Sequence, residues 1–123
     1  MSFLKKLITG RGEGYPRPVD IDDLMHPEKF LKDGVTGIAM CAHGIARSWK
    51  YAEHLTVRGE RAVFLEGGLS EIADLPNGER REAIKRIRVF SNRYAILQPD
   101  EIGEYAELLR TLGVCLVSGN GFE

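Results

Sequence analysis

The sequence has few of the features that would assign it to a membrane, disulfide-stabilised or nucleic-acid-binding class. Its 123 residues include two cysteines, one tryptophan and three histidines, and 17 basic residues face 18 acidic ones, for a net charge of −1. This balance gives no general attraction to nucleic acid or to an anionic membrane, and the longest apolar runs are far too short to span a bilayer. The N-terminus has no long apolar region and no clear cleavage site, so we expect a cytoplasmic protein.

The two cysteines lie in different contexts. We expect no disulfide between Cys41 and Cys115, because an intracellular chain normally keeps its thiols reduced. Cys115 lies in the apolar run 114–117, which predicts a buried, inert thiol. Cys41 instead follows an apolar run and opens a loop that contains glycine. Neither His26 nor His54 has metal-ligand spacing to the cysteines, and we expect no metal and no cofactor.

Most of the chain alternates between short apolar runs and amphipathic segments. Strands are predicted at 38–41, 61–66, 94–97 and 114–117. Helices are predicted at 26–34, 47–58, 79–89 and 99–112, with a turn or short helix at 69–75. Two segments near the N-terminus are a short helix at 1–9 and an irregular connection, rich in glycine and proline, at 10–20.

This alternation predicts an α/β fold of three layers, with a mostly parallel sheet of about four strands and helices on both faces. We expect one domain over residues 1–123, with the segment 1–35 packing on it. The carboxyl ends of parallel strands meet at one edge, where binding sites gather. The loops 41–47, 66–68 and 98–100 each follow a strand and should therefore lie together.

The first of these loops carries a thiol and a guanidinium six positions apart around a glycine. It reads Cys41-Ala42-His43-Gly44-Ile45-Ala46-Arg47-Ser48. A strand, a tight loop and a helix let successive N–H groups converge on one anion. We therefore expect a phosphate to be bound by the backbone of Ala42, His43, Gly44, Ile45, Ala46 and Arg47. The planar Arg47 fork would pair with two phosphate oxygens, and Gly44 would supply a positive φ.

Cys41 is the candidate nucleophile. The helix N-terminus and Arg47 favour its thiolate, which would attack phosphorus to form a covalent intermediate. Ser48 would donate a hydrogen bond to the thiolate or help it to leave. Asp100, after the strand 94–97, is the candidate general acid. Alternatively, it is only a first-turn acid, whose negative charge is stabilised by the dipole of its helix. Weaker candidates for the acid are Asp20, Asp22, Asp23 and Asp74.

Cys41 to Ser48 resembles the C-x5-R-[ST] signature of the cysteine-based phosphatases, which include the protein tyrosine phosphatases and their low-molecular-weight branch. The following residues also resemble rhodanese-like domains. The matching positions are Arg47-Ser48, Ala52, Leu55, Gly59, Val63, Leu65 and Gly67-Gly68. Together the likenesses cover residues 37–68, about a quarter of the chain.

Loop length separates the two families. The active-site loop of the sulfurtransferase rhodaneses has the pattern C-x4-R, whereas that of the phosphatases, including those with a rhodanese fold, has the pattern C-x5-R. Five residues separate Cys41 from Arg47, so the resemblance implies a phosphatase. Met40 stands where many tyrosine phosphatases have histidine, as an apolar residue does in the low-molecular-weight branch. The loop has neither the asparagine nor the second cysteine usual in that branch.

We therefore expect a cysteine-dependent phosphatase that hydrolyses a phosphomonoester, with phosphotyrosine among the candidates, through a phospho-cysteine intermediate. Two alternatives stay open: a rhodanese-like sulfurtransferase with a Cys41 persulfide, and a catalytically silent module that binds an oxyanion. The expected partner is a phosphorylated protein or small molecule, with no nucleic acid and no membrane, and the oligomeric state is left open.

Overall fold

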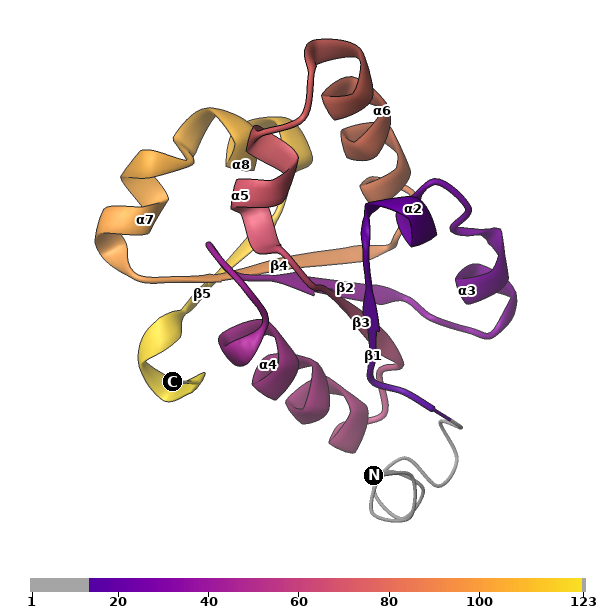
Figure 1. Cartoon of the computed structure of the whole chain (residues 1–123). Helices are drawn as coiled ribbons and strands as arrows, with labels where there is room; N and C mark the ends of the chain where they lie inside the picture. Colours follow the sequence, from indigo (N-terminus) through magenta and orange to yellow (C-terminus); the bar gives the residue numbers. More distant parts are fainter. Residues whose placement is uncertain (1–13, 123) are drawn as a thin grey trace.

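A five-stranded parallel sheet forms the centre of the structure, a computed structural model that describes residues 14–122 (Figure 1). The helix expected at 1–9 lies outside the described residues. The strands are β1 (Arg17–Val19), β2 (Gly37–Met40), β3 (Ala62–Leu65), β4 (Asn92–Leu97) and β5 (Cys115–Ser118). They are ordered β1-β3-β2-β4-β5, and every pair of neighbours is parallel.

Short helices connect the strands. They are α2 (Ile21–Leu24), α3 (Glu28–Lys32), α4 (Ala46–Val57), α5 (Gly68–Ala73), α6 (Asn77–Ile87), α7 (Pro99–Glu104) and α8 (Ala106–Leu112), followed after β5 by the 3-10 turn η1 (Gly119–Phe122). Figure 1 shows α4 on one side of the sheet and α5, α6 and α8 on the other. The expected α/β class with helices on both faces is confirmed.

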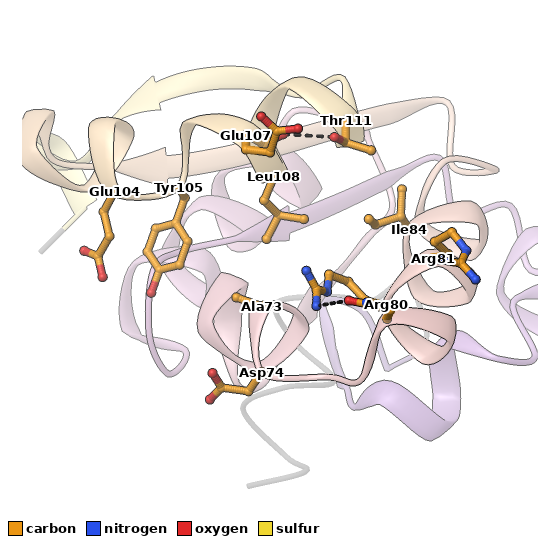
Figure 2. A pocket seen from close by; sticks show the side chains of 11 residues that line it. Ala73, Asp74, Arg80, Arg81, Ile84, Glu104, Tyr105, Glu107, Leu108 and Thr111 are labelled. Carbon is orange, nitrogen blue, oxygen red and sulfur yellow. Dashed lines mark hydrogen bonds between the residues drawn. The ribbon is translucent and has the colours of Figure 1, made fainter.

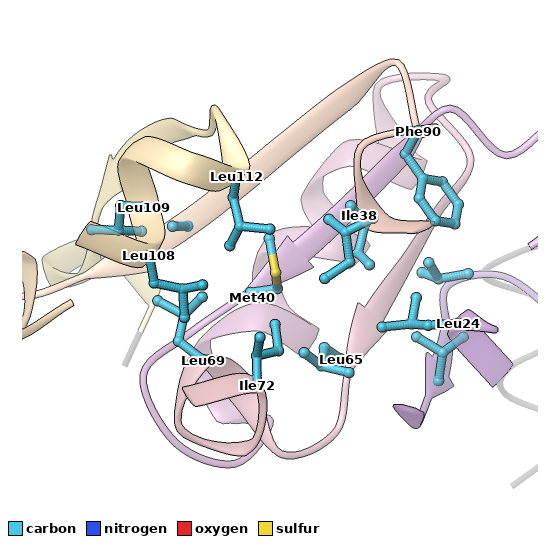
Figure 3. Close-up of a cluster of buried hydrophobic side chains, with 14 of the residues drawn as sticks. Leu24, Ile38, Met40, Leu65, Leu69, Ile72, Phe90, Leu108, Leu109 and Leu112 are labelled. Carbon is cyan, nitrogen blue, oxygen red and sulfur yellow. The ribbon is translucent and has the colours of Figure 1, made fainter. Parts of the chain in front are cut away.

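Alternate residues of the central strands enter two different cores. On β2, Ile38 and Met40 face the larger core under α5, α6 and α8, while Ala39 faces the smaller core under α4. Figure 3 shows Met40 surrounded by side chains from both the sheet and the helices. Burying one such side chain contributes about 1.5–3 kcal/mol. Because both of their faces are covered, β2 and β3 read as continuous apolar runs in the sequence.

The structure adds a fifth strand to the four expected. β1 lies within the segment 10–20, which we expected to be an irregular connection, and it pairs with β3 in the register Pro18 to Phe64. It is the edge strand beside β3, a position that tolerates proline because the outer backbone groups need no partner. Val19 at its end is fully buried.

The helix expected at 99–112 is interrupted. Tyr105 leaves the helical conformation (φ −110°, ψ 22°) between α7 and α8. Gly103, two residues earlier, is a weak helix former. The hydrogen bonds continue across the bend, from the Tyr105 N–H to the Glu101 carbonyl and from the Leu109 N–H to the Tyr105 carbonyl, at 3.0 and 2.9 Å. Tyr105, at the bend, is buried.

The expectation of a buried Cys115 is wrong. Cys115 and Leu116 are exposed. β5 is the edge strand of the sheet, so it has a neighbouring strand, β4, on one side only. Both Cys41 and Cys115 are free thiols, at opposite ends of their strands. Among residues 14–122, no helix has the length and apolar character needed to cross a membrane.

Candidate functional site at the carboxyl edge of the sheet

The loops after β2 and β3 are joined by backbone hydrogen bonds, as their expected common edge requires. Cys41 follows β2, a central strand of the sheet. The N–H groups of Leu69 and Ser70, in the first turn of α5, donate to the carbonyl oxygens of Cys41 and Ala42 at 2.8 and 3.0 Å. The base of the Cys41 loop is therefore fixed by the start of α5.

Gly68 makes this junction possible. Its φ is +72°, in the left-handed region that favours glycine. A Cβ at this position would lie 2.5 Å from the Cys41 carbonyl oxygen and 2.8 Å from that of Ala42. Both atoms are backbone, so neither has a side-chain rotation that would relieve the overlap. The loops after β2 and β3 can therefore approach this closely only because residue 68 is glycine.

We predict that Gly68→Ala destabilises the protein by about 2–4 kcal/mol, the sum of a left-handed alanine and an overpacked contact. Gly44→Ala is the matched control: its φ is +66°, yet a Cβ there would meet nothing within 4 Å. The control should cost only about 1 kcal/mol. Chemical denaturation measures both values, and equal losses would contradict the close approach.

The Cys41 sulfur lies beside Ser48, as the motif predicts. Sγ is 3.6 Å from Ser48 Oγ, and the Ser48 hydroxyl donates to the Ile45 carbonyl at 3.2 Å. Cys41 is 2% exposed and Ser48 is fully buried. Ser48, in the first turn of α4, therefore holds its hydroxyl next to the sulfur in a position from which it can stabilise a thiolate.

The backbone of the loop is oriented differently from the expected ring of N–H groups. The carbonyl oxygens of His43 and Gly44 each lie 3.4 Å from Cys41 Sγ, where either oxygen can accept a hydrogen bond from an S–H group. To bind an anion at the sulfur, these two peptide groups have to turn their N–H groups inward. The open space around Gly44 leaves room for that rotation.

The N-terminus of α4 supplies further donors. α4 has 12 residues, begins after Ile45 and has no side chain capping its first turn. The N–H groups of a first helical turn have no partner within the helix, and they carry the positive end of the helix dipole. Here that end adjoins Cys41 and Arg47, which is the arrangement that favours a bound oxyanion.

Arg47 is held by a carboxylate from the first turn of α7, the helix that follows β4, so its two Nη groups face Glu101 instead of forming the expected fork toward a phosphate. Its Nη1 and Nη2 donate to Oε1 and Oε2 of Glu101 at 2.8 and 3.1 Å, and Nη1 also donates to the Ile96 carbonyl at 3.1 Å. The side chains of Arg47 and Glu101 are 21% and 16% exposed. The hydrogen bond from Arg47 is the main cause that lowers the pKa of Glu101 below its ordinary value.

Glu101 is a site residue that the sequence reasoning missed. It also accepts the Gln98 backbone N–H at 2.8 Å, which forms the capping box of α7. The pair Gln98 and Glu101 at the start of a helix was the available signal, but only as a cap. Asp100, the expected acid, is exposed in the first turn of α7, and its catalytic role stays a prediction.

Gly119 is a second missed residue. A Cβ on Gly119 would lie 3.1 Å from Arg47 Cδ and 3.3 Å from Gln98 Nε2. The buried start of η1 thus packs against the flank of the arginine. The segments that follow β2, β3, β4 and β5 therefore meet at this edge of the sheet. This confirms the common edge that the sequence predicts for the loops after β2, β3 and β4.

The rim of the site is aromatic on one side. The His43 side chain is exposed, and its ring meets that of Tyr105 edge to face at a centroid distance of 6.2 Å. Burial raises the pKa of Tyr105, and the carboxylates of Glu104, Asp74 and Glu101 raise it further. Trp49, one residue after Ser48, is 44% exposed.

Within the described part of the chain, no group of three or more histidine, cysteine or acidic residues is placed to hold a metal ion. The chain matches no family model, no curated protein and no solved structure. The function is therefore inferred from the site itself.

Proposed function

We propose that this protein is a small cytoplasmic phosphatase that hydrolyses a phosphomonoester through a phospho-cysteine intermediate. The observation that carries the proposal is a cysteine sulfur beside a serine hydroxyl at an uncapped helix N-terminus, whose first turn also carries an arginine. Cys41 Sγ lies 3.6 Å from Ser48 Oγ, and the Arg47 fork is aligned by both oxygens of Glu101. This combination supplies a nucleophile, a group that stabilises it and a fixed cation.

In the proposed reaction the Cys41 thiolate attacks phosphorus, the P–S bond forms and the P–O bond to the leaving group breaks. The leaving oxygen takes a proton from a general acid, for which Asp100 is the candidate. Water then attacks the phospho-cysteine, the P–S bond breaks, and inorganic phosphate leaves with the thiolate restored. Arg47 and the N–H groups of the loop and of α4 stabilise the negative charge in both steps.

Two parallel assays on the wild-type protein test the proposal. We expect hydrolysis of para-nitrophenyl phosphate and its inhibition by vanadate, which mimics the transition state of phosphoryl transfer. Thiocyanate formation from thiosulfate and cyanide, without phosphate release, would instead assign the site to sulfur transfer with a Cys41 persulfide. Binding of vanadate with neither activity would assign the third alternative, a silent oxyanion-binding module.

A further inference from the structure

A groove runs from the rim of the site along the helical face. Its volume is about 520 Å³, within the range of cavities that bury small ligands. The end of α5, one side of α6 and the residues from α7 into α8 form its walls, with an apolar floor of Ala73, Ile84 and Leu108 (Figure 2). No residue of the Cys41 loop lines the groove, but Tyr105 contacts both.

Tyr105 connects the groove to the site. It lines the groove, and its ring contacts the ring of His43, which belongs to the Cys41 loop. A substrate whose phosphate occupies the loop can therefore extend past Tyr105 onto this concave surface. A polypeptide chain is long enough to continue from the loop past Tyr105 into the groove.

Opposite charges lie at the two ends of the groove. Asp74 and Glu104 lie at the Tyr105 end, and Arg81 lies at the far end (Figure 2). All three side chains are exposed. Both carboxylates contribute to the raised pKa of Tyr105, because they lie near its phenol. The acidic end would repel a phosphodiester backbone, which excludes a nucleic acid as the favoured occupant.

Two hydrogen bonds hold the Arg80 side chain in the middle of the groove. Arg80 crosses toward Ala73, and its Nη2 donates to the Asn77 side-chain oxygen at 2.7 Å and to the Leu75 carbonyl at 3.3 Å. These bonds fix the guanidinium as part of the wall. A preformed wall lowers the entropy cost of binding an extended segment.

We propose that the groove binds the peptide segment that flanks the phosphorylated residue of a phosphoprotein substrate, with a basic residue close to the phosphorylated one and an acidic residue farther along. This inference rests on the proposed phosphatase function and names its substrate class. Basic side chains near the phosphorylated residue meet Asp74 and Glu104, and the distal acid meets Arg81.

Two phosphotyrosine peptides of opposite charge order test the inference. One has lysine near the phosphotyrosine and glutamate farther out on both sides, and the other has the reverse order. At one fixed, low ionic strength, we expect wild-type kcat/KM to be about five- to tenfold higher for the first peptide. Arg81→Glu should remove this preference and leave kcat/KM for para-nitrophenyl phosphate unchanged. Equal kcat/KM for the two peptides in the wild type would overturn the inference.

Lys85→Glu is the matched control, because it makes the same charge change on an exposed position of α6 outside the groove lining. If Lys85→Glu removes the peptide preference as fully as Arg81→Glu, the preference comes from general electrostatic steering, and the inference is overturned. If the wild type hydrolyses neither para-nitrophenyl phosphate nor either peptide, the proposed function fails. The affinities of the same two peptides, measured by calorimetry, then test peptide binding in the groove. Tighter binding of the first peptide that is lost in Arg81→Glu supports the inference, and equal affinities overturn it.

Discussion

Cys41→Ser is expected to lower the hydrolysis of para-nitrophenyl phosphate at least about a thousandfold, since it removes the nucleophile while keeping its size. A serine hydroxyl ionises far less readily than a thiol, so the covalent step stops. The fold should persist, because the carbonyl oxygens of His43 and Gly44 that face the sulfur would also accept from a hydroxyl. Initial rates and circular dichroism measure the two properties.

Cys115→Ser is the control for this result. Cys115 is exposed at the start of β5, the edge strand that β4 separates from β2, so its removal should leave the rate unchanged. Loss of activity in Cys115→Ser, or retention of most activity in Cys41→Ser, would show that hydrolysis does not pass through Cys41.

Glu101→Gln is expected to lower kcat/KM roughly ten- to a hundredfold and to destabilise the protein by about 1–3 kcal/mol. The variant keeps the shape of the side chain but places an amide nitrogen against one of the two donors of Arg47. Glu101 is a positioning residue, because it acts on the reaction through Arg47. Aryl phosphate kinetics and chemical denaturation at pH 7 provide the measurements.

The pH dependence of this stability difference has a definite sign. The pKa of Glu101 is lower in the folded protein than its ordinary value, so the carboxylate contributes stability that is fully present above the unfolded pKa. That contribution is lost as the pH falls through the folded pKa. The gap in unfolding free energy between wild type and Glu101→Gln should therefore be widest near pH 7 and shrink below about pH 4.

Asp100→Asn is the matched control, since Asp100 is an exposed acid one residue earlier on the same helix. It should leave stability at pH 7 within about 0.5 kcal/mol of wild type. If Asp100 is the general acid, this variant slows alkyl phosphates, which have poor leaving groups, more than para-nitrophenyl phosphate. A stability loss equal to that of Glu101→Gln would contradict the role of the Arg47 pair.

The parts of the fold that sequence patterns predicted are those set by local periodicity and by burial on both faces. β2 and β3 were readable because four consecutive residues of each are buried. β1 was missed because a three-residue strand with a central proline has no local signature, and its pairing with β3 is a tertiary contact. The apolar run 114–117 indicated a strand, but strand order decides that Cys115 lies at an exposed edge.

The site shows the same division. Cys41 and Ser48 come from one continuous segment, so their spacing was enough to bring them together. Glu101 and Gly119 reach Arg47 only through the order of the strands, and no spacing rule connects them to the motif. The orientation of the peptide groups around Gly44 depends on a few backbone torsions, which residue types alone do not determine.

The contacts that hold Arg47 span long distances along the chain. Its acceptors on Ile96 and Glu101 lie 49 and 54 positions later. Contacts of this separation form late, since the intervening chain must first lose its loop-closure entropy. The proposed oxyanion site is therefore complete only when the sheet has formed, and a partly folded chain lacks the contacts that hold Arg47. Any oxyanion bound there would add its binding free energy to the cooperative stability of the whole fold.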